Sequence, residues 1–191
     1  MFDRVAAAMT GRASGTDDLD AVRRAAERGD LRAQSILGAL YHSGVGLPAN
    51  PQEAVKWLRK AAEQGDAEAQ VKLGGCYSDG MGVAQDYQEA VRWYRQAAEQ
   101  GNARGQLLLG LMYEQGKGIA RNDAEAVQWY RRAAEQGDAD GQVFLAGRYE
   151  KGKALPLDYG EAARWYRRAA EQGHARGQAN LGLLYEFGKG V

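Results

Sequence analysis

Histidine and cysteine are the side chains most often used for metal binding and nucleophilic catalysis, and this sequence contains very few of them. There are two histidines, His42 and His174, and one cysteine, Cys76. The histidines lie far apart and have no partners at metal-ligand spacing, so we interpret them as surface or capping residues. A lone cysteine makes no intrachain disulfide and no cysteine-based zinc site, and no base lies beside it in the sequence. We therefore expect no metal, no cofactor and no reactive thiol.

Carboxylates and glycine-rich turns are more abundant, but they recur at a fixed interval. Glu63, for example, has counterparts at positions 99, 135 and 171. A catalytic carboxylate pair is normally needed once, so recurrence favours a structural role. The Gly-x-Gly motifs at 80–82 and 116–118 follow helical segments, not strands, and are interpreted as turns instead of phosphate-binding loops. The sequence predicts a protein that is not an enzyme, because no chemically active cluster is unique to one repeat.

The recurrence continues along the chain as a 36-residue repeat. Ala-Ala-Glu-Gln-Gly begins at Ala61 and returns at Ala97, Ala133 and Ala169. A fixed period of this size indicates stacked supersecondary units, each of which needs a neighbour to bury its apolar face. We divide the chain into an N-terminal extension (1–16) and a repeat domain (17–191). The domain comprises a cap helix at 17–28, full repeats at 29–64, 65–100, 101–136 and 137–172, and a half repeat at 173–191.

Each repeat carries the start and stop signals of two helices. The first helix follows a short polar residue that can accept hydrogen bonds from free backbone amides, and it stops at a glycine. The polar residues are Asp30, Asp66, Asn102, Asp138 and, in the half repeat, His174. The second helix begins with a capping box, Asn50 with Glu53 and its three counterparts. Short loops between helices of about 13–14 residues predict antiparallel hairpins and an all-α fold.

Aromatic residues share repeat positions as well. One position of the second helix is always tryptophan, and one position of the first helix is always tyrosine. These residues are Trp57, Trp93, Trp129 and Trp165, and Tyr41, Tyr77, Tyr113, Tyr149 and Tyr185. Their spacing predicts that they belong to the core and are not exposed platforms for sugars or bases. The recurrent arginines of the second helix, such as Arg59, are interpreted as a solvated outer face.

Taken together, these motifs resemble the Sel1-like repeat family, which is related to the tetratricopeptide repeat. The resemblance covers about residues 17–191 and rests on Ala-x-x-x-Leu-Gly-x-x-Tyr-x-x-Gly-x-Gly-Val followed by Asp-x-x-Glu-Ala-x-x-Trp-Tyr-x-x-Ala-Ala. It implies a right-handed α/α superhelical solenoid that serves as a scaffold or adaptor, often in bacteria and at the envelope. Some relatives of this kind neutralise a toxin or organise envelope machinery. The fourth repeat departs from the pattern at Gly152-Lys153-Ala154, so we expect its loop to differ in shape.

Function is expected at the positions where the repeats differ from one another, because the uniform positions are needed by every hairpin. Such positions lie three and four residues apart on the first helix and so share one face. By the family resemblance, this face lines a concave groove. Apolar residues mixed with arginine are typical of protein-binding surfaces, so we expect a protein or peptide partner. A glycan or peptidoglycan ligand is the alternative. The predicted contact residues are Lys72, Cys76, Arg104, Leu108, Met112, Phe144, Arg148, Lys151, Asn180 and Leu184.

Charge and hydropathy limit the other partners. Lys plus Arg and Asp plus Glu both number 25, so no basic excess attracts nucleic acid. No apolar run is long enough to span a bilayer. The chain would be cytoplasmic if Met1 is its native start and periplasmic if a signal peptide has been removed, so its compartment is undecided. The half repeat presents Leu183, Leu184 and Phe187 with no second helix to cover them, and self-association or a further segment would do so.

Overall fold

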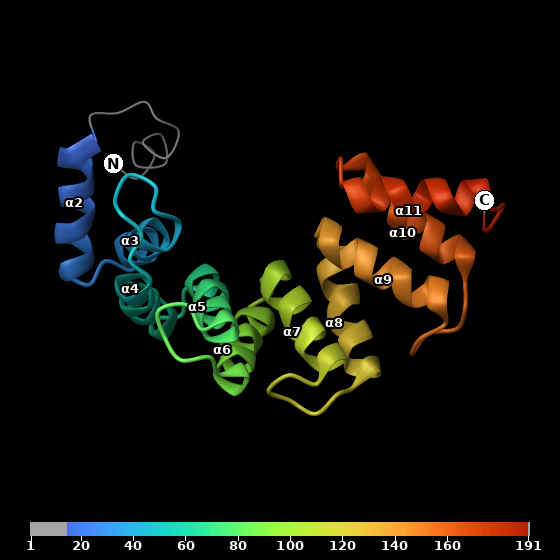
Figure 1. The fold of residues 1–191 in the computed structure, drawn as a ribbon, viewed down its shortest axis with the longest axis horizontal. Helices are drawn as coiled ribbons and strands as arrows, with labels where there is room; N and C mark the ends of the chain where they lie inside the picture. The colour runs from blue at the N-terminus through green and yellow to red at the C-terminus, as the bar shows by residue number, and fades with distance from the viewer. Residues whose placement is uncertain (1–14, 191) are drawn as a thin grey trace. The chain divides into compact units, whose positions relative to one another are not determined.

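The computed structural model describes residues 15–190, and all the regular secondary structure in that range is helical. The chain divides into two compact units, residues 1–97 and 98–191. Within each unit, consecutive helices form antiparallel hairpins (Figure 1). The predicted all-α architecture of successive hairpins is confirmed. The N-terminal extension lies outside the described residues up to position 14.

Helix bounds follow the 36-residue repeat closely. The first unit contains α2 (Gly15–Glu27), α3 (Leu31–Ser43), α4 (Pro51–Glu63), α5 (Ala67–Asp79) and α6 (Tyr87–Glu99), whose last two residues belong to the second unit. The second unit contains α7 (Ala103–Gln115), α8 (Asp123–Glu135), α9 (Ala139–Lys151), α10 (Tyr159–Glu171) and α11 (Ala175–Glu186). The odd-numbered helices are the first helices of the repeats, and the even-numbered ones are the second helices. The helix expected at 17–28 is α2.

The predicted caps of the first helices are present. Asp30 accepts a hydrogen bond from the backbone amide of Ala33 at 2.7 Å, and the corresponding aspartates and asparagine do the same in later repeats. His174 takes over this role in α11, where its Nδ1 accepts from the amide of Gly177 at 3.2 Å. Gly44 and its counterparts at 80, 116 and 152 end helices α3, α5, α7 and α9 in the left-handed conformation. The start and stop signals were therefore interpreted correctly.

The capping box of the second helix forms only in half. Asn50 accepts a hydrogen bond from the backbone amide of Glu53, as expected. The Glu53 carboxylate, however, binds Lys56 and the indole nitrogen of Trp57 instead of reaching back to Asn50. The backbone amide of Asn50 donates to the carbonyl of Tyr41 at 3.0 Å, and this bond recurs in the later loops. It closes the loop and makes the reciprocal half of the box unnecessary.

Side chains of the second helices pack over glycines of the first helices. A Cβ atom on Gly74 would lie 2.6 Å from the ring of Tyr94, and one on Gly110 would lie 2.7 Å from the ring of Tyr130. Leu58 covers Gly38 in the same way. The Leu-Gly pair of the first three full repeats is therefore explained by a close helix approach, because a Cβ atom at these glycines would meet the facing side chain. The fourth repeat has the buried Ala146 at this position.

A buried glutamine ties neighbouring hairpins together. Gln34, Gln70, Gln106 and Gln142 are buried, and the side-chain amide of each donates to the carbonyl eight residues earlier, near the end of the preceding helix. The carbonyl oxygen of Gln106 also accepts from Gln136 at 2.7 Å, and that of Gln142 accepts from Gln172. Buried amides are stable only when hydrogen-bonded, and these bonds let the glutamine join two helices.

The prediction that the recurrent tyrosines belong to the core is only partly confirmed. Those at positions 41, 77, 113 and 149 pack against the edge of the core. They are half-buried, and Tyr185 is exposed. The hydroxyls at positions 41, 77, 149 and 185 accept hydrogen bonds from arginines of the preceding helix, as in Arg59 to Tyr77 at 2.7 Å and Arg167 to Tyr185 at 2.7 Å. The arginines assigned to a solvated face therefore join adjacent helices. A tyrosine at this position keeps its ring against the helices while its polar end reaches the surface.

The prediction that all four tryptophans belong to the core is only partly confirmed. Trp57 and Trp93 are buried, whereas Trp129 and Trp165 are half-buried. The guanidinium groups of Arg132 and Arg168 lie 4.5 Å from the ring centroids of Trp129 and Trp165, respectively. A cation over an indole face is favourable and shields the ring.

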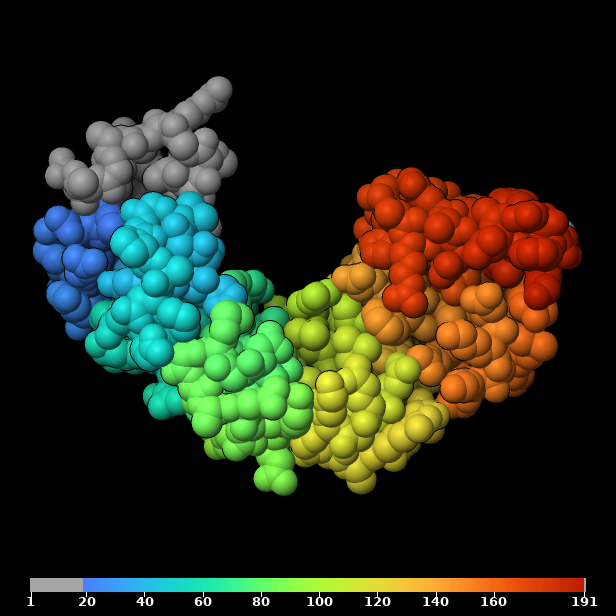
Figure 2. Space-filling model, viewed as in Figure 1, coloured from blue at the N-terminus to red at the C-terminus, as the bar shows by residue number. Residues whose placement is uncertain are grey.

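The half repeat is well packed on one side only. Figure 2 shows the side chains of α9, α10 and α11, in orange to red, as one continuous body. Leu184 is buried against Val143 and Tyr166, contrary to the prediction that it is uncovered. Leu183 is 51% exposed and Phe187 is 63% exposed, as predicted. Only one face of α11 is therefore left open.

Candidate functional site

The ten predicted contact residues divide into buried and accessible groups. Cys76 on α5, Met112 on α7 and Leu184 on α11 are buried and pack within the hairpins. They leave no side-chain surface for a partner. The accessible or half-buried residues are Lys72, Arg104, Leu108, Phe144, Arg148, Lys151 and Asn180. All but Lys72 lie in the second unit.

Cys76 illustrates why a variable position need not be a contact residue. Its Sγ lies 4.0 Å from Nδ1 of His42, a contact that is weak for sulfur. Burial, with a further contribution from the nearby Asp79 carboxylate, raises the pKa of the Cys76 thiol to about 11. The thiol is therefore a protonated packing group at neutral pH.

We expect Cys76 to resist thiol reagents in the folded protein. A pKa raised by about two units reduces the thiolate fraction near pH 8 by roughly 100-fold, and burial blocks access further. The rate of reaction with a chromogenic disulfide should therefore be at least about 100-fold lower in buffer than in denaturant. Equal rates in the two conditions would contradict the buried assignment.

Four of the predicted residues meet at one cavity in the second unit. Phe144, Arg148 and Lys151 from α9 and Asn180 from α11 line a cavity of about 360 Å³. Glu114 from α7 and Arg176 from α11 also line it. We call this cavity the Phe144 pocket. Three successive first helices supply most of its residues, and Tyr166 of α10 completes the lining, so the side chains are held on helical backbone instead of loops.

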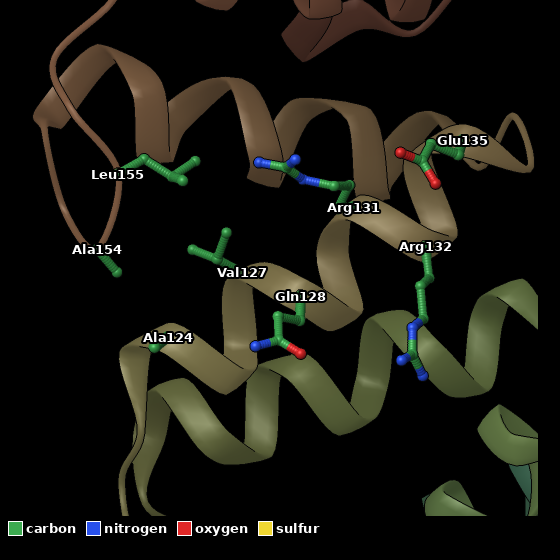
Figure 3. Close-up of a pocket in the computed structure, with 8 residues that line it drawn as sticks. All are labelled: Ala124, Val127, Gln128, Arg131, Arg132, Glu135, Ala154 and Leu155. Carbon is green, nitrogen blue, oxygen red and sulfur yellow. The ribbon is translucent and has the colours of Figure 1, made fainter.

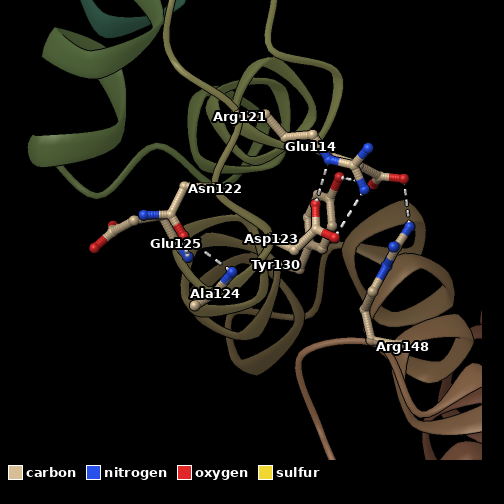
Figure 4. Close-up of polar contacts among 8 residues, drawn as sticks. All are labelled: Glu114, Arg121, Asn122, Asp123, Ala124, Glu125, Tyr130 and Arg148. Carbon is tan, nitrogen blue, oxygen red and sulfur yellow. Dashed lines mark hydrogen bonds and ion pairs between the residues drawn. The ribbon is translucent and has the colours of Figure 1, made fainter.

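Glu114 organises one wall of the Phe144 pocket. It accepts a hydrogen bond from the hydroxyl of Tyr130 at 2.5 Å and forms an ion pair with Arg148 at 2.5 Å (Figure 4). Burial, followed by the hydrogen bond to Glu114, raises the pKa of Tyr130 well above its ordinary value. Tyr130 therefore remains a hydrogen-bond donor to the carboxylate. Charge-assisted bonds of this kind fix both partners in one arrangement.

Phe144 lies between this network and α11. Its ring stacks with that of Tyr130 at a centroid distance of 5.3 Å, and the Arg176 guanidinium lies 5.5 Å from the Phe144 centroid. Tyr166 donates to Glu150 at 2.7 Å on the other side of the lining. Burial and this bond raise the pKa of Tyr166, so it also remains a donor. The pocket combines one aromatic ring with fixed charged groups.

Sequence reasoning missed Glu114 and Glu150 as site residues. Their repeat position is occupied by His42 and Ser78 in the earlier repeats and by glutamate again at Glu186, so it is less variable than the position of Phe144, where all five residues differ. The only signal in the sequence is the change from His42 and Ser78 to glutamate in the later repeats. Their pairing with tyrosines of the second helix could not have been found in this way, because the position of Tyr130 is uniform in the last three full repeats.

Arg104 belongs to a separate polar cluster. Its Nη1 lies 2.7 Å from a carboxylate oxygen of Asp140, the residue at the same position of the next repeat. His174 lies 3.0 Å from the other oxygen of Asp140. Burial opposes the ionisation of Asp140, but hydrogen bonds from His174 and Arg104 outweigh it and hold the pKa of Asp140 below its ordinary value. This cluster links α7, α9 and the start of α11.

A second cavity, of about 450 Å³, lies beside α8. Figure 3 shows Ala124, Val127 and Arg131 of α8 on one side of it, with Ala154 and Leu155 of the next loop opposite. Ala154 has φ of 58°, a left-handed conformation like that of Gly82 at the same repeat position. The expected change of loop shape is therefore wrong at this residue. The alanine keeps the glycine conformation under strain.

Replacing Ala154 with glycine is expected to stabilise the protein. Glycine adopts the left-handed conformation without the strain of about 1–2 kcal/mol that alanine suffers there. This gain exceeds the extra backbone entropy that glycine loses on folding, about 0.5–1 kcal/mol. The free energy of unfolding should rise by about 0.5–1 kcal/mol in urea titrations. A lower free energy of unfolding would contradict this expectation. It would mean that packing of the Ala154 methyl group stabilises the protein by more than the backbone strain destabilises it.

The repeats of this chain match a known protein family. A model of the Sel1 repeat matches residues 31–66, 67–102, 103–138, 139–174 and 175–191. The chain belongs to the Sel1 repeat family. The resemblance predicted from the motifs is thereby confirmed. Sel1 repeat proteins are generally scaffolds for protein interactions.

Solved Sel1 repeat structures agree with the fold. A protective antigen of uropathogenic Escherichia coli strains with an SLR fold is 41% identical, with a TM-score of 0.85 over 90% of this chain and 37% of that one. A Sel1 repeat protein of Oxalobacter formigenes is 39% identical, with a TM-score of 0.79 over 85% of this chain and 65% of that one. The chain therefore spans less than two thirds of the length of either Sel1 relative.

A third structure is more distant. An immunity protein of Pseudomonas aeruginosa is 22% identical, with a TM-score of 0.58 over 83% of this chain and 59% of that one, a likeness of fold alone. No curated protein sequence matches the chain significantly. Within residues 15–190, no Sel1 helix has the length and apolar character needed to cross a membrane.

Proposed function

We propose that this Sel1 repeat chain binds a protein or peptide at the Phe144 pocket and acts as a scaffold or adaptor, without catalysing a reaction. The observation that carries the proposal is the composition of the pocket. Phe144, Arg148, Lys151 and Asn180 all occupy first-helix positions where the repeats differ, and they line one cavity. Residues that are not needed by every hairpin are the ones free to serve a partner.

The chemistry of the pocket favours a polypeptide partner. Binding energy at protein interfaces is concentrated in a few aromatic and arginine residues that are surrounded by polar groups. Phe144 with Arg176 over its ring provides such a pair, and Glu114 with Arg148 gives the wall a fixed shape. A groove along the whole chain stays a prediction, since the proposal rests on the second unit alone.

A glycan ligand is less well supported. Sugars stack on open aromatic faces. The faces of Trp129 and Trp165 are approached by Arg132 and Arg168, and Phe144 is approached by Arg176. The family resemblance also implies two more specific roles, toxin neutralisation and envelope assembly. Either role would be a particular case of the proposed protein binding.

The test requires a partner identified by cross-linking and mass spectrometry, whose affinity for the full chain is then measured. Phe144→Ala with Arg176→Glu should raise the Kd at least about 30-fold, the loss expected for a binding hot spot of roughly 2 kcal/mol. Arg164→Glu on α10 makes the same charge reversal at an exposed position outside the pocket and should change the Kd by less than about threefold. An unchanged Kd in the pocket variant, with the fold intact, would refute the proposal.

A further inference from the structure

We infer that the Phe144 pocket recognises an acidic peptide segment, in which a carboxylate contacts Arg176 and Lys151 beside an apolar residue on Phe144. This inference rests on the proposed function and specifies its ligand.

The two carboxylates that line the pocket are already engaged. Glu114 is paired with Arg148 and accepts the hydroxyl of Tyr130. Glu150 accepts the hydroxyl of Tyr166. Arg148 is only 12% exposed and is directed to Glu114, so it is not the group that would meet a ligand first. These internal bonds engage three of the five charged side chains. Glu114 and Arg148 cancel each other's charge, whereas Glu150 keeps its negative charge, so three positive and two negative groups leave the pocket with a formal surplus of one positive charge.

The other two charged side chains of the pocket are positive and exposed. Lys151 and Arg176 are both exposed, and among residues 15–190 neither forms an ion pair with a carboxylate. Arg176 is held over the ring of Phe144 at 5.5 Å, which orients its guanidinium at the rim of the pocket. A guanidinium can bind a carboxylate through two parallel hydrogen bonds, so the rim suits an acidic side chain.

The preceding repeat lacks this arrangement. At the position of Arg176 it has Asp140, which is engaged by Arg104 and His174, and at the position of Lys151 it has Gln115. The aromatic Phe144 is likewise replaced by Leu108. Positive charge, an aromatic ring and a cavity therefore coincide at α9 and α11. In a chain with equal numbers of acidic and basic residues, this local surplus selects for negative partners.

An unbiased peptide-display selection against the full chain tests the inference. Peptides whose binding is lost in Phe144→Ala are sequenced, synthesised, and remade with each Glu or Asp changed to Gln or Asn. We expect Phe144-dependent peptides to be enriched in acidic residues. Amidation of the key carboxylate should weaken binding to the unmodified chain at least about tenfold, a loss typical of a charge-assisted pair.

The matched variant is Arg176→Gln with Lys151→Gln, which removes both charges and keeps the side chains polar. The acidic peptide and its amide should bind this variant about equally, because the positive partners are gone. Phe144-dependent peptides that tolerate amidation would overturn the acidic ligand and leave the proposed function standing. Failure to obtain any Phe144-dependent peptide would overturn both. Thermal melting followed by circular dichroism confirms that each variant is folded.

Discussion

Glu114→Ala is expected to lower the free energy of unfolding by about 3 kcal/mol. The substitution leaves the guanidinium of Arg148 in a largely buried site without its counter-ion, and breaking one side of such a pair typically costs about 3–5 kcal/mol. The partial exposure of Glu114, 25%, places the expected value at the lower end of that range. Within the described residues, the Arg148 Nε is also buried and has no hydrogen-bond partner. Urea denaturation would measure the loss.

The next repeat supplies a matched control. Glu150 accepts the hydroxyl of Tyr166 at 2.7 Å, as Glu114 accepts that of Tyr130, but Leu184 replaces the arginine. Glu150→Ala should therefore cost only about 1.5 kcal/mol, the lower end of the value of one hydrogen bond to a charged group. Adding Arg148→Met to Glu114→Ala should restore part of the lost stability, because no buried charge remains. Equal losses for the two glutamate variants would contradict the assigned role of the ion pair.

Gly82→Ala is expected to destabilise the protein by about 3 kcal/mol. Gly82 has φ of +72°, which costs an alanine about 1–2 kcal/mol. A Cβ atom there would also lie 2.1 Å from the carbonyl oxygen of Pro51, so the backbone of the loop or of α4 must move. Overpacking of this kind adds about 1–3 kcal/mol. The shift in the unfolding midpoint would measure the sum.

Gly46 separates the two contributions. It occupies the same repeat position with φ of +76°, yet a Cβ atom there would meet no atom within 4 Å. Gly46→Ala should therefore lose only the conformational part, about 1 kcal/mol. Equal losses in the free energy of unfolding for Gly46→Ala and Gly82→Ala would show that the close approach to Pro51 does not affect stability. Together with Ala154→Gly, these variants test one turn in three repeats.

Much of the fold could be predicted because its signals are local and repeated. A short polar residue before each first helix and a glycine after it fix the helix ends, and both act through backbone atoms within a few residues. The 36-residue interval then requires stacking, since one hairpin cannot bury its own apolar face. These arguments need no knowledge of distant contacts.

The errors concern residues whose role depends on another helix. Tyr77 has core spacing, but Arg59 from the preceding helix holds its hydroxyl at the surface. Gln106 looks polar and ordinary in the sequence, yet it is buried and joins Ala98 to Gln136. Periodicity shows which face a residue occupies and not which side chain it meets.

The candidate site was only partly predictable for the same reason. Variation among repeats selected Phe144, Lys151 and Asn180, which line the pocket, and also Cys76 and Met112, which are buried. A position can differ between repeats because a partner uses it or because the local packing differs. Sequence comparison within one chain does not separate the two causes, whereas burial does.

Hydrogen exchange of the full chain, with and without a bound partner or selected peptide, tests the central claim most directly. It reports the change in protection of each segment without any substitution. We expect slowed exchange in α9 around 144–151 and in α11 around 176–180. Protection confined to the second helices α8 and α10, with α9 and α11 unchanged, would contradict the assignment of the Phe144 pocket as the binding site.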